Sequence, residues 1–193
     1  RMQEFTDLVE RSHNANLRVI IDFVPNHVAR EYHSTCKPKG VEDLGATDNP
    51  AWAFSPLNNF YYIHEAFAPQ FDMQGYSENP ARATGNDCFT AHPGKDDWYE
   101  TIKLNYGVFY QNGGEQQFDP IPNTWYKMRD ILLFWASKGI DGFRCDMAEM
   151  VPQAFWAWAI TQVKEQYPDI LFIAEVYNPD LYRSYIAAGF DYL

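Results

Sequence analysis

The sequence predicts an α/β protein, namely part of a (β/α)8 TIM barrel with a long irregular insertion after the first strand present. Three short apolar runs rich in β-branched residues alternate with amphipathic helical patterns, which is typical of parallel sheets built from βαβ units. Asp146 and Glu175, near the ends of the second and third runs, are 29 residues apart. That spacing is close to the roughly 31 residues per βα unit of a barrel of about 250 residues. No GxGxxG follows a strand, as a Rossmann fold would require.

The first predicted barrel segment, residues 1–27, contains one helix and one strand. Apolar residues at i, i+3 and i+4 predict a helix over 5–12. The run 17–24 is rich in valine and isoleucine and predicts a strand. Because its apolar character is nearly continuous, we expect this strand to be covered on both faces, as are the later two.

Residues 28–120 are predicted to form an inserted subdomain. They contain eight of the eleven glycines and seven of the twelve prolines, together with several turn dipeptides. A loop of this length without structure is uncommon in a compact domain. We therefore expect an irregular subdomain with short strands of its own.

The second predicted barrel segment covers residues 121–193. Helices are expected over three ranges and strands over two, and they alternate along the chain: 125–137, 140–147, 154–165, 170–176 and 181–186. The last five residues resemble a helix stop followed by the opening of another strand. Three strands cannot close an eight-stranded barrel, so the remainder of a longer barrel chain is expected.

Composition and charge narrow the possible partners. The chain is 46% hydrophobic and 21% charged, which is typical of a globular protein, and its net charge is −11. Such an acidic chain repels nucleic acids and anionic lipid surfaces, so neither is expected as a partner. No apolar run approaches the length needed to span a bilayer. No signal peptide is recognisable, and the compartment stays open.

Acidic residues lie near the C-terminal ends of all three predicted strands: Asp22, Asp146 and Glu175. One acid in such a place usually caps a turn or pairs with a basic group, but three in register favour a functional site. Arg144 precedes Asp146 by two residues, so both side chains should share a face and the arginine should keep the aspartate ionised. Glu175 has apolar sequence neighbours, so desolvation, together with a neighbouring anion, should raise its pKa.

Two carboxyl groups whose pKa values are pushed apart suit a nucleophile and a general acid. This pair is the chemistry of a retaining glycoside hydrolase. The sequence also resembles such enzymes directly. The segments DFVPNH (22–27), GFRCD (142–146) and AEV (174–176) are similar to the first three conserved segments of the α-amylase family, glycoside hydrolase family 13, and occur in the family order. KLN (103–105) resembles a further short family segment.

The resemblance implies cleavage or transfer of α-glucosidic bonds in starch-like glucans. It implies that Asp146 is the nucleophile, that Glu175 is the general acid and base, and that Arg144 orients the nucleophile. It further implies that His27 hydrogen-bonds the sugar and that Asp22 is mainly architectural. Hydrolysis is favoured over transfer.

The resemblance also implies what else the chain needs and lacks. No cofactor is required, although Asn26 matches a structural calcium ligand of many members, with Asp72, Asp87 and Asp97 as candidate partners. The family's fourth segment, a histidine-aspartate pair, is absent. Residues 148–150 stand where α-amylases often place a lysine-histidine pair. Linkage, chain length and product preference therefore stay open.

Three rival hypotheses accompany this prediction. The chain is alternatively a non-catalytic or incomplete amylase-like fragment that at most binds carbohydrate, or an α-glucan transglycosylase. A barrel metal enzyme with the same three acids as ligands is the third rival. Arg144 argues against it, because a fixed cation beside a ligand opposes metal binding.

Structural roles are expected for several other residues. The three cysteines show no metal spacing: Cys145 is expected to be buried, and Cys36 and Cys88 would pair only in an exported protein. Histidines 33, 64 and 92 form no metal motif and are expected at the surface or in the core. Core packing is also expected for most aromatic residues of the insertion, with one or two acting as sugar platforms, among Trp52, Tyr61, Tyr62, Trp98 and Tyr99.

Overall fold

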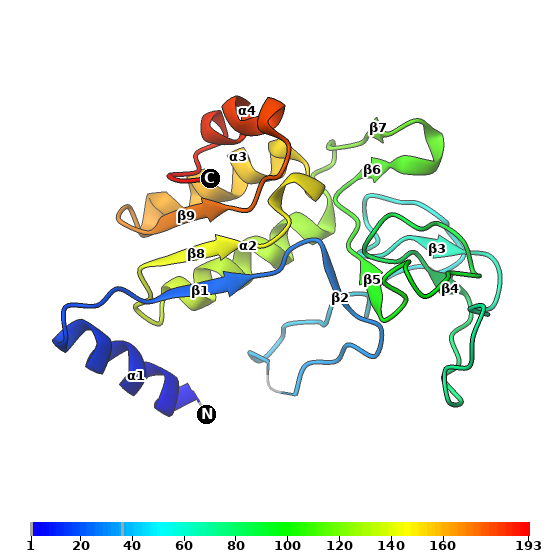
Figure 1. The fold of residues 1–193 in the computed structure, drawn as a ribbon, viewed down its shortest axis with the longest axis horizontal. Helices are drawn as coiled ribbons and strands as arrows, with labels where there is room; N and C mark the ends of the chain where they lie inside the picture. The colour runs from blue at the N-terminus through cyan, green and yellow to red at the C-terminus, as the bar shows by residue number, and fades with distance from the viewer. Residues whose placement is uncertain (1, 36) are drawn as a thin grey trace. The chain divides into compact units, whose positions relative to one another are not determined.

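The structure, a computed structural model, describes residues 2–35 and 37–193, so the pairing considered for Cys36 lies outside the described residues. The chain divides into two compact units (Figure 1). Unit 1 contains the residues up to Pro25 and those from Tyr126 onward, and unit 2 is Asn26–Trp125. The sequence placed these boundaries after residues 27 and 120.

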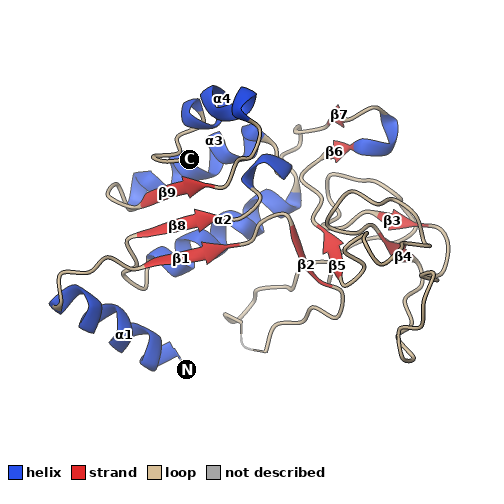
Figure 2. Cartoon of the chain, in the orientation of Figure 1, coloured by secondary structure: helices blue, strands red, loops and turns tan. Residues whose placement is uncertain are grey.

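Unit 1 is built on a three-stranded parallel sheet (Figures 1 and 2). The order is β1 (Ile20–Phe23), β8 (Gly142–Cys145) and β9 (Leu171–Ala174). All three strands lie within the predicted runs, and the predicted parallel arrangement is confirmed. Tyr192 forms a parallel bridge to Ile173, which is the predicted opening of a further strand.

The predicted helices are present, with ends that differ by a few residues. They are α1 (Met2–Asn14), α2 (Asn123–Ala136), α3 (Gln153–Gln166) and α4 (Tyr182–Ala187). Three short 3-10 turns accompany them: η1 (Tyr110–Asn112), η2 (Ala148–Met150) and η3 (Pro179–Leu181). No helix in residues 2–35 and 37–193 has the length and apolar character to cross a membrane.

The core of unit 1 lies between the sheet and its helices. Phe143, Phe172 and Trp156 are completely buried. The Trp156 ring contacts Phe23 of β1 at 6.3 Å and Phe190 at 4.9 Å between centroids. Burying each large side chain contributes about 1.5–3 kcal/mol. Because side chains alternate along a strand, Phe143 and Cys145 face this core, while the residue between them faces the other side of the sheet.

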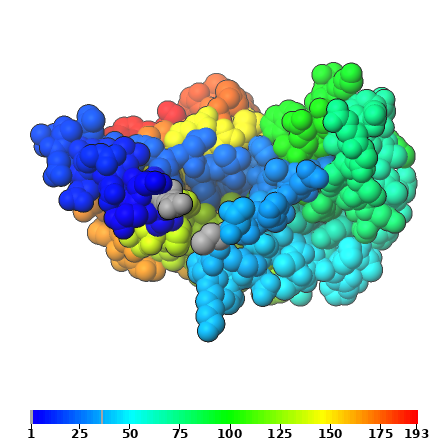
Figure 3. All heavy atoms as spheres, turned by 90° about the horizontal axis from the view of Figure 1, so that it is seen from below, coloured from blue at the N-terminus to red at the C-terminus, as the bar shows by residue number. Residues whose placement is uncertain are grey.

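The prediction that all three strands are covered on both faces is wrong for β1. Ile20 is 36% exposed and Asp22 is also exposed, whereas β8 is mostly buried. Side chains alternate along β1, and the exposed Ile20 and Asp22 share the face of the sheet that carries Arg144, opposite the buried Phe23. Helix α1 is also largely exposed, as the space-filling view shows (Figure 3). It is attached through Phe5, whose ring packs edge-on against Trp135 at 5.2 Å.

Unit 2 consists of short antiparallel pairs joined by loops, as predicted for the insertion. The pairs are β2 (His27–Ala29) with β5 (Thr101–Lys103), β3 (Tyr62–Ile63) with β4 (Ala81–Arg82), and β6 (Val108–Phe109) with β7 (Glu115–Gln116). A buried ion triad joins two of these pairs. Both Glu78 carboxylate oxygens lie 2.6 Å from arginine nitrogens, one from Arg30 and one from Arg82.

Candidate active site

Three acidic side chains and one arginine meet at the carboxyl end of the parallel sheet in unit 1. Asp22 on β1 lies opposite Arg144 on β8 in the strand register. Asp146 follows β8 directly and Glu175 follows β9. The backbone N–H of Glu175 donates to the Cys145 carbonyl at 3.0 Å, so the ladder continues to the acids. Parallel strands end at one edge, and this is where α/β barrels place their chemistry.

Arg144 contacts all three acids. Its Nη1 lies 2.9 Å from Asp22 Oδ1 and 2.7 Å from Asp146 Oδ1, and its Nη2 lies 2.7 Å from Glu175 Oε1. The hydrogen bond with Asp22 is the main reason that the pKa of Arg144 is raised. The predicted pairing of Arg144 with Asp146 is confirmed, whereas its bridges to Asp22 and Glu175 were not predicted.

This arrangement bears on the metal-enzyme rival. A guanidinium group lies among the three acids, where a metal ion bound by all of them would have to lie. In the part of the chain that the structure describes, no three His, Cys, Asp or Glu side chains are grouped to hold a metal ion. The acids are therefore organised around an internal cation.

The pKa of Glu175 is lowered, so the predicted rise is wrong. The largest cause is a hydrogen bond from the Tyr177 hydroxyl to Oε1, followed by one from the Met147 backbone N–H to Oε2 at 2.9 Å. Burial acts in the opposite direction, while a hydrogen bond with Asp146 and the charge of Arg144 lower the pKa further. The prediction considered the apolar sequence neighbours and a neighbouring anion, whereas the fold supplies donors that stabilise the carboxylate.

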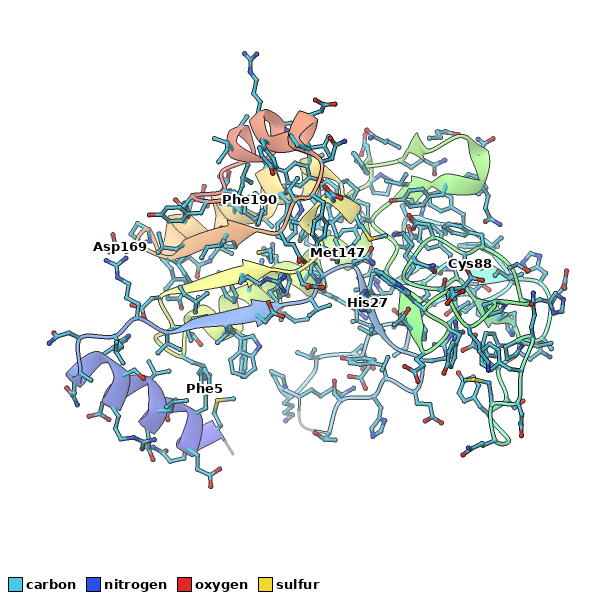
Figure 4. The ribbon with its side chains drawn as sticks, in the orientation of Figure 1. Phe5, His27, Cys88, Met147, Asp169 and Phe190 are labelled. Atoms are coloured by element: carbon cyan, nitrogen blue, oxygen red, sulfur yellow. The ribbon has the colours of Figure 1, made fainter. Side chains whose placement is uncertain are left out.

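Met147 reaches Glu175 through an unusual backbone conformation. Its φ is 47°, in the left-handed region that residues other than glycine rarely adopt. Figure 4 shows Met147 just beyond the carboxyl end of β8. The next residue, Ala148, donates its N–H to the Glu175 carbonyl at 3.1 Å. Such conformations cost about 1–3 kcal/mol and cluster at functional sites. The turn after Asp146 thus ties the two carboxyl-bearing segments together.

Glu149 fixes the loop that carries Tyr177. Its Oε2 accepts hydrogen bonds from the backbone N–H groups of Tyr177 at 2.9 Å and Asn178 at 3.0 Å. The Tyr177 residue is nevertheless 64% exposed. Its backbone is therefore held in place, while its ring is accessible to solvent beside Glu175.

His27 and Asn26 lie in unit 2, at the start of β2 (Figure 4). The His27 ring packs edge-on against Trp98 at 5.6 Å between centroids. Gly85 approaches His27 closely: a Cβ added at Gly85 would lie 2.9 Å from His27 Cβ. Asn26 Nδ2 donates to the Gly85 carbonyl at 2.7 Å. Within unit 2, the His27 side chain is thus surrounded by Trp98, Gly85 and Asn26.

The residues around Asn26 do not fit a calcium ion. Its Oδ1, the atom that would coordinate the metal, accepts a hydrogen bond from Lys103 Nζ at 2.9 Å, and Asp87 pairs with the same ammonium at 2.5 Å. Asp72 and Asp97 each accept a backbone N–H of their own loop. Calcium needs six to eight converging oxygens, and an ammonium group among them repels it.

The remaining candidates divide by exposure. Tyr61 and Tyr62 are buried, as core packing predicts, whereas Trp52 and Trp98 are 51% and 38% exposed. Tyr99 is half-buried, so the two tryptophans are the more accessible candidates for sugar platforms. Cys145 is completely buried, which raises the pKa of its thiol, and histidines 33, 64 and 92 are at the surface.

Sequence reasoning missed Tyr177, Met147 and Lys103. The spacing could have indicated Tyr177. It follows Glu175 by two residues, and the same spacing of two predicted that Arg144 and Asp146 share a face. Met147 gave no such signal, because its partner is 28 residues away in the chain. The KLN segment drew attention to Lys103, but it did not indicate the partner Asn26, which is 77 residues away.

An arginine-linked set of acids at the carboxyl edge of a parallel sheet defines a segment of an α/β barrel with a carboxylate site. Comparison with known proteins agrees with this class. The alpha-amylase catalytic-domain model matches residues 1–188. The chain therefore belongs to the alpha-amylase family, and the predicted family and barrel fold are confirmed.

Individual relatives show how far the likeness extends. The alpha-1,4-glucan:maltose-1-phosphate maltosyltransferase of Cereibacter sphaeroides is 44% identical over 97 residues, which are 50% of this chain and 14% of that protein. Alpha-amylase 3 of Dictyoglomus thermophilum is 24% identical over 183 residues, covering 92% of this chain and 30% of that one. The crystal structure of an alpha-amylase from Geobacillus thermoleovorans matches with TM-score 0.58 and 20% identity, covering 100% of this chain and 34% of that one.

These relatives fix the class and leave the activity open. The chain spans between about a seventh and a third of their lengths. Their names include both a transferase and a hydrolase, so family membership places the chain among proteins that cleave or transfer glycosidic bonds. At 20% identity, the crystal structure supports the fold alone.

Proposed function

We propose that this chain carries the catalytic carboxylates of a retaining enzyme that hydrolyses α-glucosidic bonds in starch-like glucans or maltooligosaccharides. The observation that supports this best is the link from Asp146 through Arg144 to Glu175 at the carboxyl end of the sheet. Retaining glycosidases require a nucleophilic carboxylate and a second carboxyl group that acts as acid and then as base. The proposed reaction uses no cofactor.

In the proposed first step, an Asp146 oxygen attacks the anomeric carbon while Glu175 gives its proton to the leaving glycosidic oxygen. The bond to the leaving sugar breaks as the bond to Asp146 forms. In the second step, Glu175 takes a proton from water, whose oxygen attacks the same carbon and releases Asp146. Two inversions give net retention. Arg144 holds and orients the Asp146 carboxylate throughout.

Glu175 has to be protonated before the first step, although its contacts in this structure favour the charged form. Its strongest stabilising contact is the hydroxyl of Tyr177, whose ring is accessible. A bound glucan that displaces this hydroxyl removes the largest cause of the lowered pKa. Substrate binding then moves Glu175 toward the protonated form that a general acid needs.

The remaining site residues receive supporting roles. We assign Asp22 to holding Arg144, since their side chains form an ion pair with a 2.9 Å separation. We assign His27 to a hydrogen bond with the sugar, on the basis of the DFVPNH motif and family membership.

A second candidate function is transfer rather than hydrolysis. It is favoured by the 44% identity, over 97 residues, to a maltosyltransferase whose name includes both an α-1,4-glucan and maltose 1-phosphate. The same carboxylate pair serves this reaction if a glucan hydroxyl replaces water in the second step. The residues of unit 1 are compatible with both reactions.

The test measures both reactions on the purified protein. One arm follows reducing-end release from maltoheptaose, and the other follows phosphate release from maltose 1-phosphate with a glucan acceptor. Asp146→Asn and Glu175→Gln are compared with Glu165→Gln, which alters an exposed acid on α3. We expect Asp146→Asn to abolish activity and Glu175→Gln to lower kcat by about 10²–10⁴-fold. Glu165→Gln should leave activity unchanged.

Each other outcome favours a rival. Phosphate release without hydrolysis favours the transferase. Activity that survives in both acid variants contradicts the carboxylate mechanism. A folded protein that binds maltoheptaose but has neither activity favours the non-catalytic alternative.

A further inference from the structure

A buried lysine organises the residues around His27 in unit 2. The Lys103 side chain is 2% exposed and lies at the end of β5, with its Cα paired to that of His27 in the register. A buried ammonium group needs hydrogen-bond partners and a counter-charge. Asp87 supplies the charge, and Asn26 Oδ1 accepts a hydrogen bond at 2.9 Å. The ammonium also lies 5.0 Å from the ring centroid of Tyr110.

These contacts determine which way the Asn26 amide points. The Lys103 ammonium can only donate, so the Asn26 atom that faces it must be the carbonyl oxygen. The backbone carbonyl of Gly85 can only accept, so the atom at 2.7 Å from it must be the amide nitrogen. The Lys103 ammonium and the Gly85 carbonyl thus require the same orientation of the Asn26 amide.

The oriented amide then acts on the His27 ring. Asn26 Nδ2 lies 3.2 Å from His27 Nδ1 and has a second hydrogen to donate. Nδ1 must therefore be an acceptor. A neutral imidazole that accepts at Nδ1 carries its proton on Nε2.

We propose that Lys103 is a positioning residue that, through Asn26, holds His27 as the Nε2–H tautomer. His27 is thereby presented as a hydrogen-bond donor at Nε2, suited to an oxygen acceptor such as a sugar hydroxyl. That last step, the choice of ligand, rests on the proposed function, whereas the tautomer is a property of unit 2 alone.

The decisive measurement is made without substrate. Long-range ¹H–¹⁵N correlation of the uniformly ¹⁵N-labelled protein shows which ring nitrogen of each histidine is protonated. The His27 signals are identified by their loss in His27→Gln. We expect Nε2–H. A predominance of Nδ1–H, or an averaged mixture of both tautomers, overturns the proposal whatever the catalytic activity.

Two variants test the role of Lys103. Lys103→Met removes every donor while keeping a similar length. Only the Gly85 carbonyl then orients the Asn26 amide, so we expect the Nε2–H preference of His27 to weaken and a measurable share of Nδ1–H to appear. Lys103→Gln restores an N–H donor and should retain Nε2–H. Lys95→Met, which changes an exposed lysine of the same unit, is the control. An unchanged tautomer in Lys103→Met contradicts the proposal, because a purely structural lysine would give that result.

A further variant covers the case in which Lys103→Met does not fold. Asn26→Asp replaces the donor facing Nδ1 by an oxygen, so His27 should change to Nδ1–H. Retention of Nε2–H overturns the proposal. If the protein is active, folded Lys103→Met should show a several-fold rise in KM for maltoheptaose. An inactive protein with the Nε2–H tautomer counts against the proposed function and leaves the positioning role supported.

Discussion

At the scale of single residues, the contact between Tyr177 and Glu175 leads to a prediction about how kcat/KM depends on pH. The Tyr177 hydroxyl stabilises the carboxylate and lowers the pKa of Glu175. In Tyr177→Phe this donor is gone, so the pKa should rise. Because a general acid works in its protonated form, the basic limb of the profile of kcat/KM against pH should move to higher pH.

Direct titration of Glu175 separates this effect from catalysis. Side-chain ¹³C chemical shifts should report a higher pKa in Tyr177→Phe than in the wild type. Tyr182→Phe, at a half-exposed tyrosine on α4, is the control and should not change it. An unchanged Glu175 titration in Tyr177→Phe means that the hydroxyl does not control this carboxyl group.

Predictions about single residues from the sequence were right for one contact and wrong for one pKa. The period of two along a strand correctly placed Arg144 beside Asp146, since that relation is local. The pKa of Glu175 was predicted in the wrong direction, because its donors come from other segments or from a residue outside the strand. Burial alone is a poor guide to a carboxyl group whose partners are determined by the tertiary fold.

At the scale of elements, Gly142 allows the close approach of β8 and β9. A Cβ on Gly142 would lie 2.6 Å from the Leu171 carbonyl oxygen and 2.9 Å from Leu171 Cβ. Backbone atoms cannot move aside as a side chain can. Gly142→Ala should therefore destabilise the sheet by about 1–3 kcal/mol in urea unfolding. Gly94→Ala, whose added Cβ would lie 3.4 Å from Asp97 Oδ2, should have little effect. Equal stability of the two variants would contradict this packing.

Asp141 joins α1 to the sheet and makes this attachment depend on pH. Burial disfavours its charge, but hydrogen bonds from the Val19 N–H and from His13 outweigh it and lower the pKa below 3.8. The stabilisation is therefore fully present above about pH 4 and is lost as the pH falls through the lowered folded-state value. Asp141→Asn should cost about 1–3 kcal/mol at pH 7.

Thermal unfolding between pH 7 and pH 2.5 tests this dependence. The difference in Tm between the wild type and Asp141→Asn should shrink in the most acidic samples. Asp169→Asn, at an exposed residue just before β9, should follow the wild type throughout. A difference that stays constant over this range would show that Asp141 does not act through its charge.

Element boundaries were predictable because hydrophobic periodicity is a local property. The strand runs 140–147 and 170–176 enclose β8 and β9, and their parallel order followed from the helices between them. The exposure of β1 was not predictable in the same way. The run 17–24 is rich in valine and isoleucine, which favour a strand, but what covers each face of the strand is decided by the rest of the fold.

At the scale of the whole molecule, the net charge of −11 distinguishes the two candidate reactions. A neutral maltooligosaccharide has no net charge to be repelled, so its KM should be nearly independent of salt. Maltose 1-phosphate is an anion, and screening of the protein's negative field should lower its KM as salt rises. Kinetics at about 50 and 500 mM NaCl, with each substrate in turn, measure this difference. Equal salt dependence for both substrates would contradict the charge argument.

The ammonium of Lys103 has a consequence for how unit 2 responds to its surroundings. A bound ion leaves its site upon dilution or when a chelator competes for it, and its stabilising effect follows its free concentration. The cation between Asn26 and Asp87 is covalently part of the polypeptide, so it is present at fixed stoichiometry and obeys no binding isotherm. At this position, Asn26 and Asp87 are held by a lysine side chain, so these contacts do not depend on the concentration of a free ion.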